Sequence, residues 1–175
     1  MSSWRSFETE RLILRPTSIE DADFIFELLN TPKWLQNIGD RNIRTKEDAA
    51  AYIRNKMYPQ LERLGFSNYT LIRKNDQEKV GSCGLYDREG LEGVDIGYAL
   101  LPQFEGNGYA YEAAVKLKAA AHNEFGITII NGITSKENLS SQRLLEKLGL
   151  LLVGTTRLPG EDVDLLLFKT DPHSV

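Results

Sequence analysis

The stretch that most constrains the fold is residues 93–126, "GVDIGYALLPQFEGNGYAYEAAVKLKAAAHNEFG". Its first part alternates apolar residues with small or polar ones, as a strand with one face on a core does. The apolar positions are Val94, Ile96, Tyr98 and Leu100. Its last part is rich in alanine at helical spacing. Two glycines, Gly106 and Gly108, lie between them. We therefore expect a strand that turns through a glycine loop directly into a helix.

Further helices are predicted from capping signals. Ser18 with Asp21, and Thr45 with Asp48, have the spacing of a capping box. Pro59 is expected to kink or end the second of these helices. Residues 30–45 have turn formers and no clear period, which predicts a long loop, and a later helix is expected after Asn138.

Strands are predicted in several other runs rich in apolar and β-branched residues. They are residues 9–16, 66–73, 79–86 and 127–134, followed by two runs around a Pro-Gly turn near the C-terminus. The sequence has no repeat, low-complexity tract or linker, and 175 residues fit one domain. The pattern therefore predicts a single α/β domain, residues 1–175, with a mixed sheet.

Composition argues against several functional classes. The formal net charge is −4, and no basic cluster is longer than a pair, so nucleic-acid binding is not expected. No run approaches the ~18 apolar residues of a membrane span. The N-terminus lacks a signal-like segment and Cys83 is the one cysteine, which favours a cytoplasmic protein. With only His122 and His173, neither a histidine triad nor a metal site is expected.

The glycine loop has two interpretations. Gly106 and Gly108 lack a Cβ, and the free N–H groups of the helix that follows favour an anion, so the loop suits a phosphate. It could instead be a tight turn that binds nothing. The dinucleotide fingerprint would need a third glycine where Tyr111 stands, and the Gly-Lys-Ser/Thr of a P-loop is missing.

The loop, Gln103-Phe104-Glu105-Gly106-Asn107-Gly108, resembles the acetyl-CoA-binding signature Q/R-x-x-G-x-G/A of the GNAT superfamily of N-acetyltransferases. The segments "TERLILRPTSIEDA", "VGSCGL" and "ENLSSQRLLEKLGL" follow the family's order and spacing. The first is similar to the ribosomal-protein N-terminal (alanine/serine) acetyltransferases. The resemblance implies a mixed, mostly antiparallel sheet of about seven strands, split in a V and flanked by about four helices.

The resemblance also implies how acetyl-CoA is held. The backbone of Tyr98, Ala99 and Leu100 would run along the pantetheine arm, with Asn138 beside it; Asn138 could also be only a helix cap. Loop and helix amides would bind the pyrophosphate, at Gln103, Gly106, Asn107, Gly108, Tyr109 and Ala110. Glu105 stands where the family often has a basic residue, and we expect it to point to solvent. Glu112 fits a structural role at the start of the helix.

The implied reaction is direct transfer of the acetyl group of acetyl-CoA to a primary amine in a ternary complex, with no metal. Leu145 occupies the position of the family's tyrosine acid, and Ser141 matches the serine of the ribosomal branch. Ser141 could equally be an ordinary helix residue. Asp95 is the best candidate for the base, although it could be a solvated strand residue. Other candidate bases are Glu89, Glu92 and Asp40.

The acceptor amine would be a protein N-terminus or a small molecule. Residues 30–45 lie on the family's acceptor side, where Asp40 could hold an ammonium group and Trp34 could pack on the acceptor or only anchor the loop. Because Leu145 replaces the tyrosine acid, a non-catalytic acyl-CoA-binding or sensing module is the alternative function. A homodimer is possible, since dimers are frequent in the family.

Overall fold

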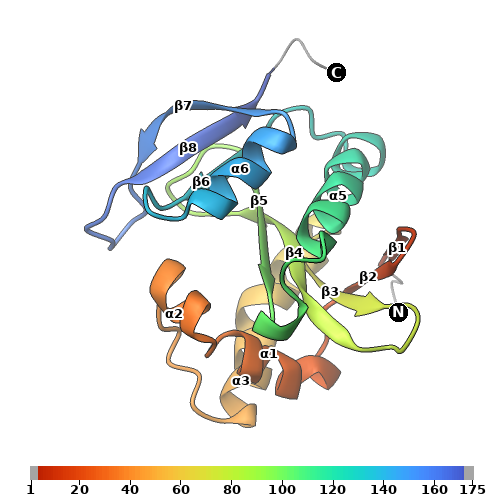
Figure 1. The fold of residues 1–175 in the computed structure, drawn as a ribbon. Coiled ribbons are helices and arrows are strands. Elements are labelled where there is room, and N and C mark those ends of the chain that lie inside the picture. Colours follow the sequence, from red (N-terminus) through yellow and green to blue (C-terminus); the bar gives the residue numbers. More distant parts are fainter. Residues whose placement is uncertain (1–3, 172–175) are drawn as a thin grey trace.

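The computed structural model describes residues 4–171, so His173 lies outside the described residues. One sheet of eight strands runs through the molecule in the order β1-β2-β3-β4-β5-β6-β8-β7, and helices cover it (Figure 1). The strands are β1 (Phe7–Glu8), β2 (Leu12–Pro16), β3 (Asn68–Arg73), β4 (Lys79–Asp87), β5 (Val94–Leu100), β6 (Ile130–Thr134), β7 (Leu150–Thr156) and β8 (Leu165–Thr170). The predicted α/β fold with a mixed sheet is confirmed, with one strand more than expected.

The sheet divides at its one parallel pair. All other neighbouring strands are antiparallel. β5 and β6 pair at only two positions, Val94 with Ile130 and Asp95 with Asn131. Beyond these residues β5 continues away from β6 towards the glycine loop (Figure 1). This divergence is the V that the sequence resemblance implies.

Helices lie on both faces of the sheet. They are α1 (Ala22–Leu28), α2 (Pro32–Asn37), α3 (Lys46–Tyr52), α4 (Tyr58–Leu64), α5 (Tyr109–Phe125) and α6 (Leu139–Lys147). One apolar core lies between the sheet and α5 and α6, and a second is built around α1 and α3. Tyr98 and Leu100 of β5 contact the first core, whereas Ala99 contacts the second. The predicted alternation of β5 is therefore confirmed, and β5 separates the two cores.

One local prediction was wrong, and another is met only in part. Residues 30–45, expected to be a long loop, contain α2, which begins with Thr31 as N-cap and Pro32 in the first turn. Pro59 was expected to kink or end the helix before it: α3 does give way to a π-helical turn, Ile53–Met57, shortly before Pro59, but the chain then continues as α4. Pro59 lies in the first turn of α4, which begins directly after the wider π turn. A helix tolerates a residue without a backbone N–H in its first turn. Within residues 4–171, no helix is long and apolar enough to cross a membrane.

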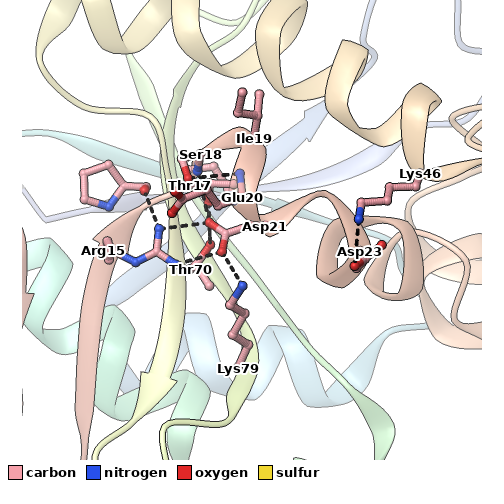
Figure 2. Close-up of polar contacts among 12 residues, drawn as sticks. Arg15, Thr17, Ser18, Ile19, Glu20, Asp21, Asp23, Lys46, Thr70 and Lys79 are labelled. Atoms are coloured by element: carbon pink, nitrogen blue, oxygen red, sulfur yellow. Dashed lines mark hydrogen bonds and ion pairs between the residues drawn. The ribbon is translucent and has the colours of Figure 1, made fainter.

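A buried carboxylate joins the strands to α1. Asp21 is fully buried and belongs to the predicted capping box with Ser18. It accepts bonds from Arg15 of β2, at 2.7 Å, and from Thr70 of β3, and it pairs with Lys79 of β4 at 2.7 Å (Figure 2). Burial raises the pKa of Asp21, but the bonds from Arg15 and Lys79 outweigh burial and hold the pKa below 3.8. One side chain thus holds three strands and the first helix together.

Replacing Asp21 with Asn should lower the free energy of unfolding by about 3–5 kcal/mol, since Arg15 and Lys79 both lose their anion. Because the pKa of Asp21 is lowered on folding, this stability is present above pH 3.8 and is lost as the pH falls through the folded-state pKa. Urea denaturation at several pH values measures both effects. Asp23→Asn is the control, because the pair of Asp23 with Lys46 is exposed (Figure 2) and its loss should cost under ~1 kcal/mol.

Candidate active site

The glycine loop ends in a helix N-terminus that is open to a ligand. Gly106 and Gly108 both have a positive φ, of 79° and 80°, which L-residues with side chains rarely adopt. Gly108 is the N-cap of α5 and supplies no side-chain cap, so the first N–H groups of α5 have no acceptor from it. Gly106, Asn107 and Gly108 are exposed. The loop therefore presents backbone donors to an anion at the positive end of a 17-residue helix.

Arg11, from the turn between β1 and β2, holds this loop in place. Its Nη2 donates to the carbonyl oxygen of Asn107 at 2.9 Å, its Nε donates to Glu112 at 2.8 Å, and its guanidinium lies 4.5 Å from the centre of the Tyr109 ring. Glu112 also accepts from Thr9 Oγ1 and from the backbone N–H of Arg11. The structural role expected for Glu112 is thus confirmed. Sequence reasoning missed Arg11, because Glu112 lies 101 residues away.

Asp95 lies where β5 and β6 separate. It is 1% exposed, so it is not a solvated strand residue. Burial raises the pKa of Asp95 to about 6, against the opposing effect of Arg88, whose Nε donates to Oδ1 at 2.8 Å. A carboxyl group with a pKa of about 6 is mostly ionised at neutral pH and still basic enough to take a proton. The buried pair of Asp95 and Arg88 is thus suited to general-base chemistry.

Asn131 lies beside Asp95 in the sheet, on β6. It is also 1% exposed, and its Nδ2 donates to the carbonyl oxygen of Glu92 at 2.7 Å. Its Oδ1 is buried and has no hydrogen-bond partner among residues 4–171. A buried acceptor without a partner costs stability and often marks a functional site. Nothing in the sequence pattern distinguished Asn131, because it lies in an apolar run.

Tyr98 and Ser141 link β5 to α6. The Tyr98 hydroxyl of β5 lies 3.0 Å from Ser141 Oγ and donates to the Ser141 carbonyl oxygen on α6, also at 3.0 Å. Asn138 is the N-cap of α6, and its Oδ1 accepts from the backbone N–H of Ser141 at 3.3 Å. Leu145 is buried and packs on Gly132 of β6. A phenol is therefore present near Ser141, but it comes from β5 rather than from position 145.

The remaining acceptor-side candidates differ in their surroundings. Trp34 packs against the core around α1 and α3, and its Nε1 is buried without a partner among the described residues. Asp40 is exposed and bound by both Nη atoms of Arg44, at 2.5 and 3.0 Å. The Arg44 bonds lower the pKa of Asp40 to about 2, which makes it a poor base. Glu89 and Glu92 are exposed.

The sequence led us to expect that Glu105 points to solvent, but in the structure Glu105 forms an ion pair. Its side chain is 32% exposed, and its Oε2 lies 2.6 Å from Nζ of Lys33 in α2. The loop that presents donors to an anion therefore carries an acidic residue, and Lys33 of α2 offsets its charge. Lys33 had no sequence signal, because 72 residues separate it from Glu105.

In the described part of the chain, neither Cys83 nor a cluster of metal-ligating side chains adds to the candidate site. Cys83 is completely buried in β4, and burial raises the pKa of its thiol to about 12, which fits its predicted role as a small apolar core residue. Among residues 4–171, no group of three or more histidine, cysteine or acidic side chains could hold a metal ion.

These features fit a long anionic ligand. The uncapped glycine N-terminus of α5 suits a pyrophosphate, and the unpaired part of β5 leads from there to Asp95 at the vertex of the V. Sequence comparison agrees with this geometry: the acetyltransferase (GNAT) domain matches residues 11–151. The chain belongs to the GNAT acetyltransferase family, and it is an acetyl-CoA-dependent N-acetyltransferase.

Individual proteins are similar to this chain in sequence or in fold. The uncharacterized N-acetyltransferase YoaA of Bacillus subtilis is 28% identical over 151 residues, which are 86% of this chain and 85% of YoaA. The ribosomal-protein-S5-alanine acetyltransferase of Vibrio fischeri has a similar fold, with a TM-score of 0.79 at 18% identity over 97% of this chain and 98% of that one. RimL, a ribosomal L7/L12 alpha-N-protein acetyltransferase solved with coenzyme A, gives 0.79 at 18% identity over 94% and 97%.

Proposed function

We propose that this enzyme transfers the acetyl group of acetyl-CoA directly to a primary amine, with Asp95 as general base and the N-terminus of α5 as pyrophosphate site. The observation that supports it most is the uncapped glycine N-cap of α5 beside the diverging strands β5 and β6. Bound there, acetyl-CoA would supply an activated acyl group. The loop and helix amides would hold its phosphates at Gln103, Gly106, Asn107, Gly108, Tyr109 and Ala110, and the backbone of Tyr98, Ala99 and Leu100, with Asn138, would flank its pantetheine arm.

Asp95 would take the proton of the acceptor amine. An amine arrives mostly as ammonium at neutral pH and must lose a proton before it can attack. Asp95 is buried, so we infer that a water carries the proton to it, with the free Oδ1 of Asn131 as the second acceptor for that water. Arg88 keeps the carboxylate oriented and stabilises its charge.

Ser141 and Tyr98 would protonate the leaving thiolate together. The Ser141 hydroxyl lies within hydrogen-bond distance of the Tyr98 phenol, so a proton given up by one can be replaced by the other. The family's tyrosine at position 145 would then be replaced by a phenol reaching the same region from β5. This assignment makes the buried Leu145 compatible with catalysis.

The acceptor would bind between α2 and the vertex of the V. Trp34 is partly buried there, and its buried indole N–H has no partner among residues 4–171. Asp40 would attract an ammonium group only together with Arg44, since the two form an exposed pair. Names of structural neighbours favour the N-terminus of a ribosomal protein as the acceptor. A cytoplasmic location and a homodimer remain predictions.

A thiol-release assay tests the function. The enzyme, acetyl-CoA and separate amines would be mixed: peptides with N-terminal alanine or serine, a polyamine and a free amino acid. Release of free thiol that depends on one amine supports the proposal and identifies the acceptor class. Tight binding of acetyl-CoA without thiol release on any amine would instead establish the sensing module, the alternative that the missing tyrosine at position 145 favours.

The proposed acid predicts a pair of variants with the same effect. Tyr98→Phe and Ser141→Ala should each lower kcat about 10- to 100-fold, and the double variant should be no worse than the more impaired single one, because the two act as a unit. Steady-state kinetics and calorimetric Kd values for CoA, which should not change, measure this. Ser140→Ala is the control, since the hydrogen bond that Ser140 Oγ donates goes to Asn138 and not to Tyr98 or Ser141. Normal turnover in both single variants would exclude this acid.

A further inference from the structure

Glu105 is out of place in a loop that binds phosphates. It follows the short 3-10 turn Pro102–Phe104 and precedes Gly106, in the middle of the proposed pyrophosphate site. An ionised carboxylate there repels a diphosphate. The structure shows how this repulsion is removed: the ammonium group of Lys33 lies 2.6 Å from Oε2 of Glu105.

Lys33 reaches the loop from a fixed position. It lies in the first turn of α2, where Thr31 Oγ1 accepts the N–H of Trp34, and Trp34 packs on the core around α1 and α3. The Lys33 side chain is 64% exposed and that of Glu105 is 32% exposed. The Glu105 side chain is therefore the more covered of the two, whereas most of the Lys33 side chain is open to solvent.

The other cations beside the loop are already bound. Arg11 donates to Glu112 and to the carbonyl oxygen of Asn107. Arg73 lies over the Phe104 ring at 4.9 Å and pairs with Asp76 at 2.5 Å. Among these three cations, Lys33 is the one that pairs with the carboxylate of the loop.

We propose that Lys33 is a cofactor-binding residue: held by Glu105, it cancels the charge of that carboxylate and presents its ammonium group to the pyrophosphate of acetyl-CoA. The proposal rests on the proposed function of the loop. It has a consequence for the order of events, because Lys33 belongs to the acceptor-side helix α2. Because α2 also carries Trp34, the bound cofactor would lie against the acceptor-side helix before the acceptor arrives.

A double-mutant cycle tests this role by binding alone. Calorimetry would measure the Kd of CoA and of pantetheine, which lacks phosphates, for the wild type, Lys33→Gln, Glu105→Gln and the double variant. Lys33→Gln should raise the Kd of CoA about tenfold, since it exposes Glu105 to the phosphates, and should leave pantetheine binding unchanged. Glu105→Gln should restore most of the affinity that Lys33→Gln loses.

Lys46→Gln is the matched control. Lys46 is 60% exposed and pairs with Asp23, so its removal changes the net charge equally without touching the loop. It should bind CoA as the wild type does. Equal CoA binding by Lys33→Gln and Lys46→Gln, or no restoration by Glu105→Gln, would overturn the inference alone. Failure of the wild type to bind CoA would overturn the proposed function as well.

Discussion

Gly108→Glu is expected to abolish binding of acetyl-CoA, with a rise in Kd of at least about 100-fold, while the fold persists. Gly108 caps α5 with a φ of 80°, and a Cβ there would lie 3.5 Å from Nη2 of Arg11. Space for a side chain therefore exists, and Arg11 would hold the new carboxylate over the N–H groups that the pyrophosphate needs. An anion in the anion site competes directly with the ligand. Isothermal calorimetry with acetyl-CoA measures the loss.

Gly108→Ala separates charge from backbone strain. Both variants force a side chain into a left-handed conformation, at a cost of about 1–2 kcal/mol. Their melting temperatures should therefore fall by similar amounts, whereas alanine should retain most of the affinity. Unchanged calorimetric binding by Gly108→Glu would show that this loop is not the phosphate site.

Asp95→Asn is expected to lower kcat/KM about 10²- to 10⁴-fold near neutral pH and to remove one limb of its pH profile. Because the pKa of Asp95 is raised to about 6, activity in the wild type should fall as the pH drops below 6 and the carboxylate takes up a proton. A peptide α-amino group titrates near pH 8, about two units higher, so the two limbs can be resolved. In Asp95→Asn, the pH profile of kcat/KM should retain only the change caused by titration of the amine near pH 8.

Asp87→Asn is the control for this variant. Asp87 is the last residue of β4, which pairs with β5. It is exposed and pairs with Arg63, so its loss should leave the pH profile of kcat/KM intact. The Kd of CoA should not change in either variant, because Asp95 lies at the far end of β5 from the loop. If activity of Asp95→Asn still falls near pH 6, the general base is a group other than Asp95.

The sequence predicted those parts of the fold that depend on neighbouring residues. The capping boxes at Ser18 and Thr45 and the cap at Asn138 are all formed, because each needs contacts only three residues away. α2 was missed although its signal was present: a threonine followed by Pro32 is a common helix start. The π turn was missed because Pro59 was expected to kink or end the helix, whereas the helix continues past it after a turn with π-helical hydrogen bonds.

The sequence proposed the candidate site in outline, without its contacts. The motif pointed to the glycine loop, and the family resemblance pointed to Asp95 and Ser141. The partners that set their chemistry are Arg11, Lys33, Arg88 and the side chain of Tyr98, and only Arg88 lies within ten residues of its partner. Charge pairs formed by folding leave no local pattern, so the electrostatics of the loop and the raised pKa of Asp95 required the structure.

The divergence of β5 and β6 has a consequence for the protein without its ligand. In residues 4–171 the two strands pair only at their first positions, so the stretch from Ile96 to Leu100 has an open edge towards β6, in the middle of a sheet. Open edges are templates for strands of other molecules and promote aggregation. An extended ligand filling the gap would cover these unpaired backbone groups and take the place of a strand from another molecule.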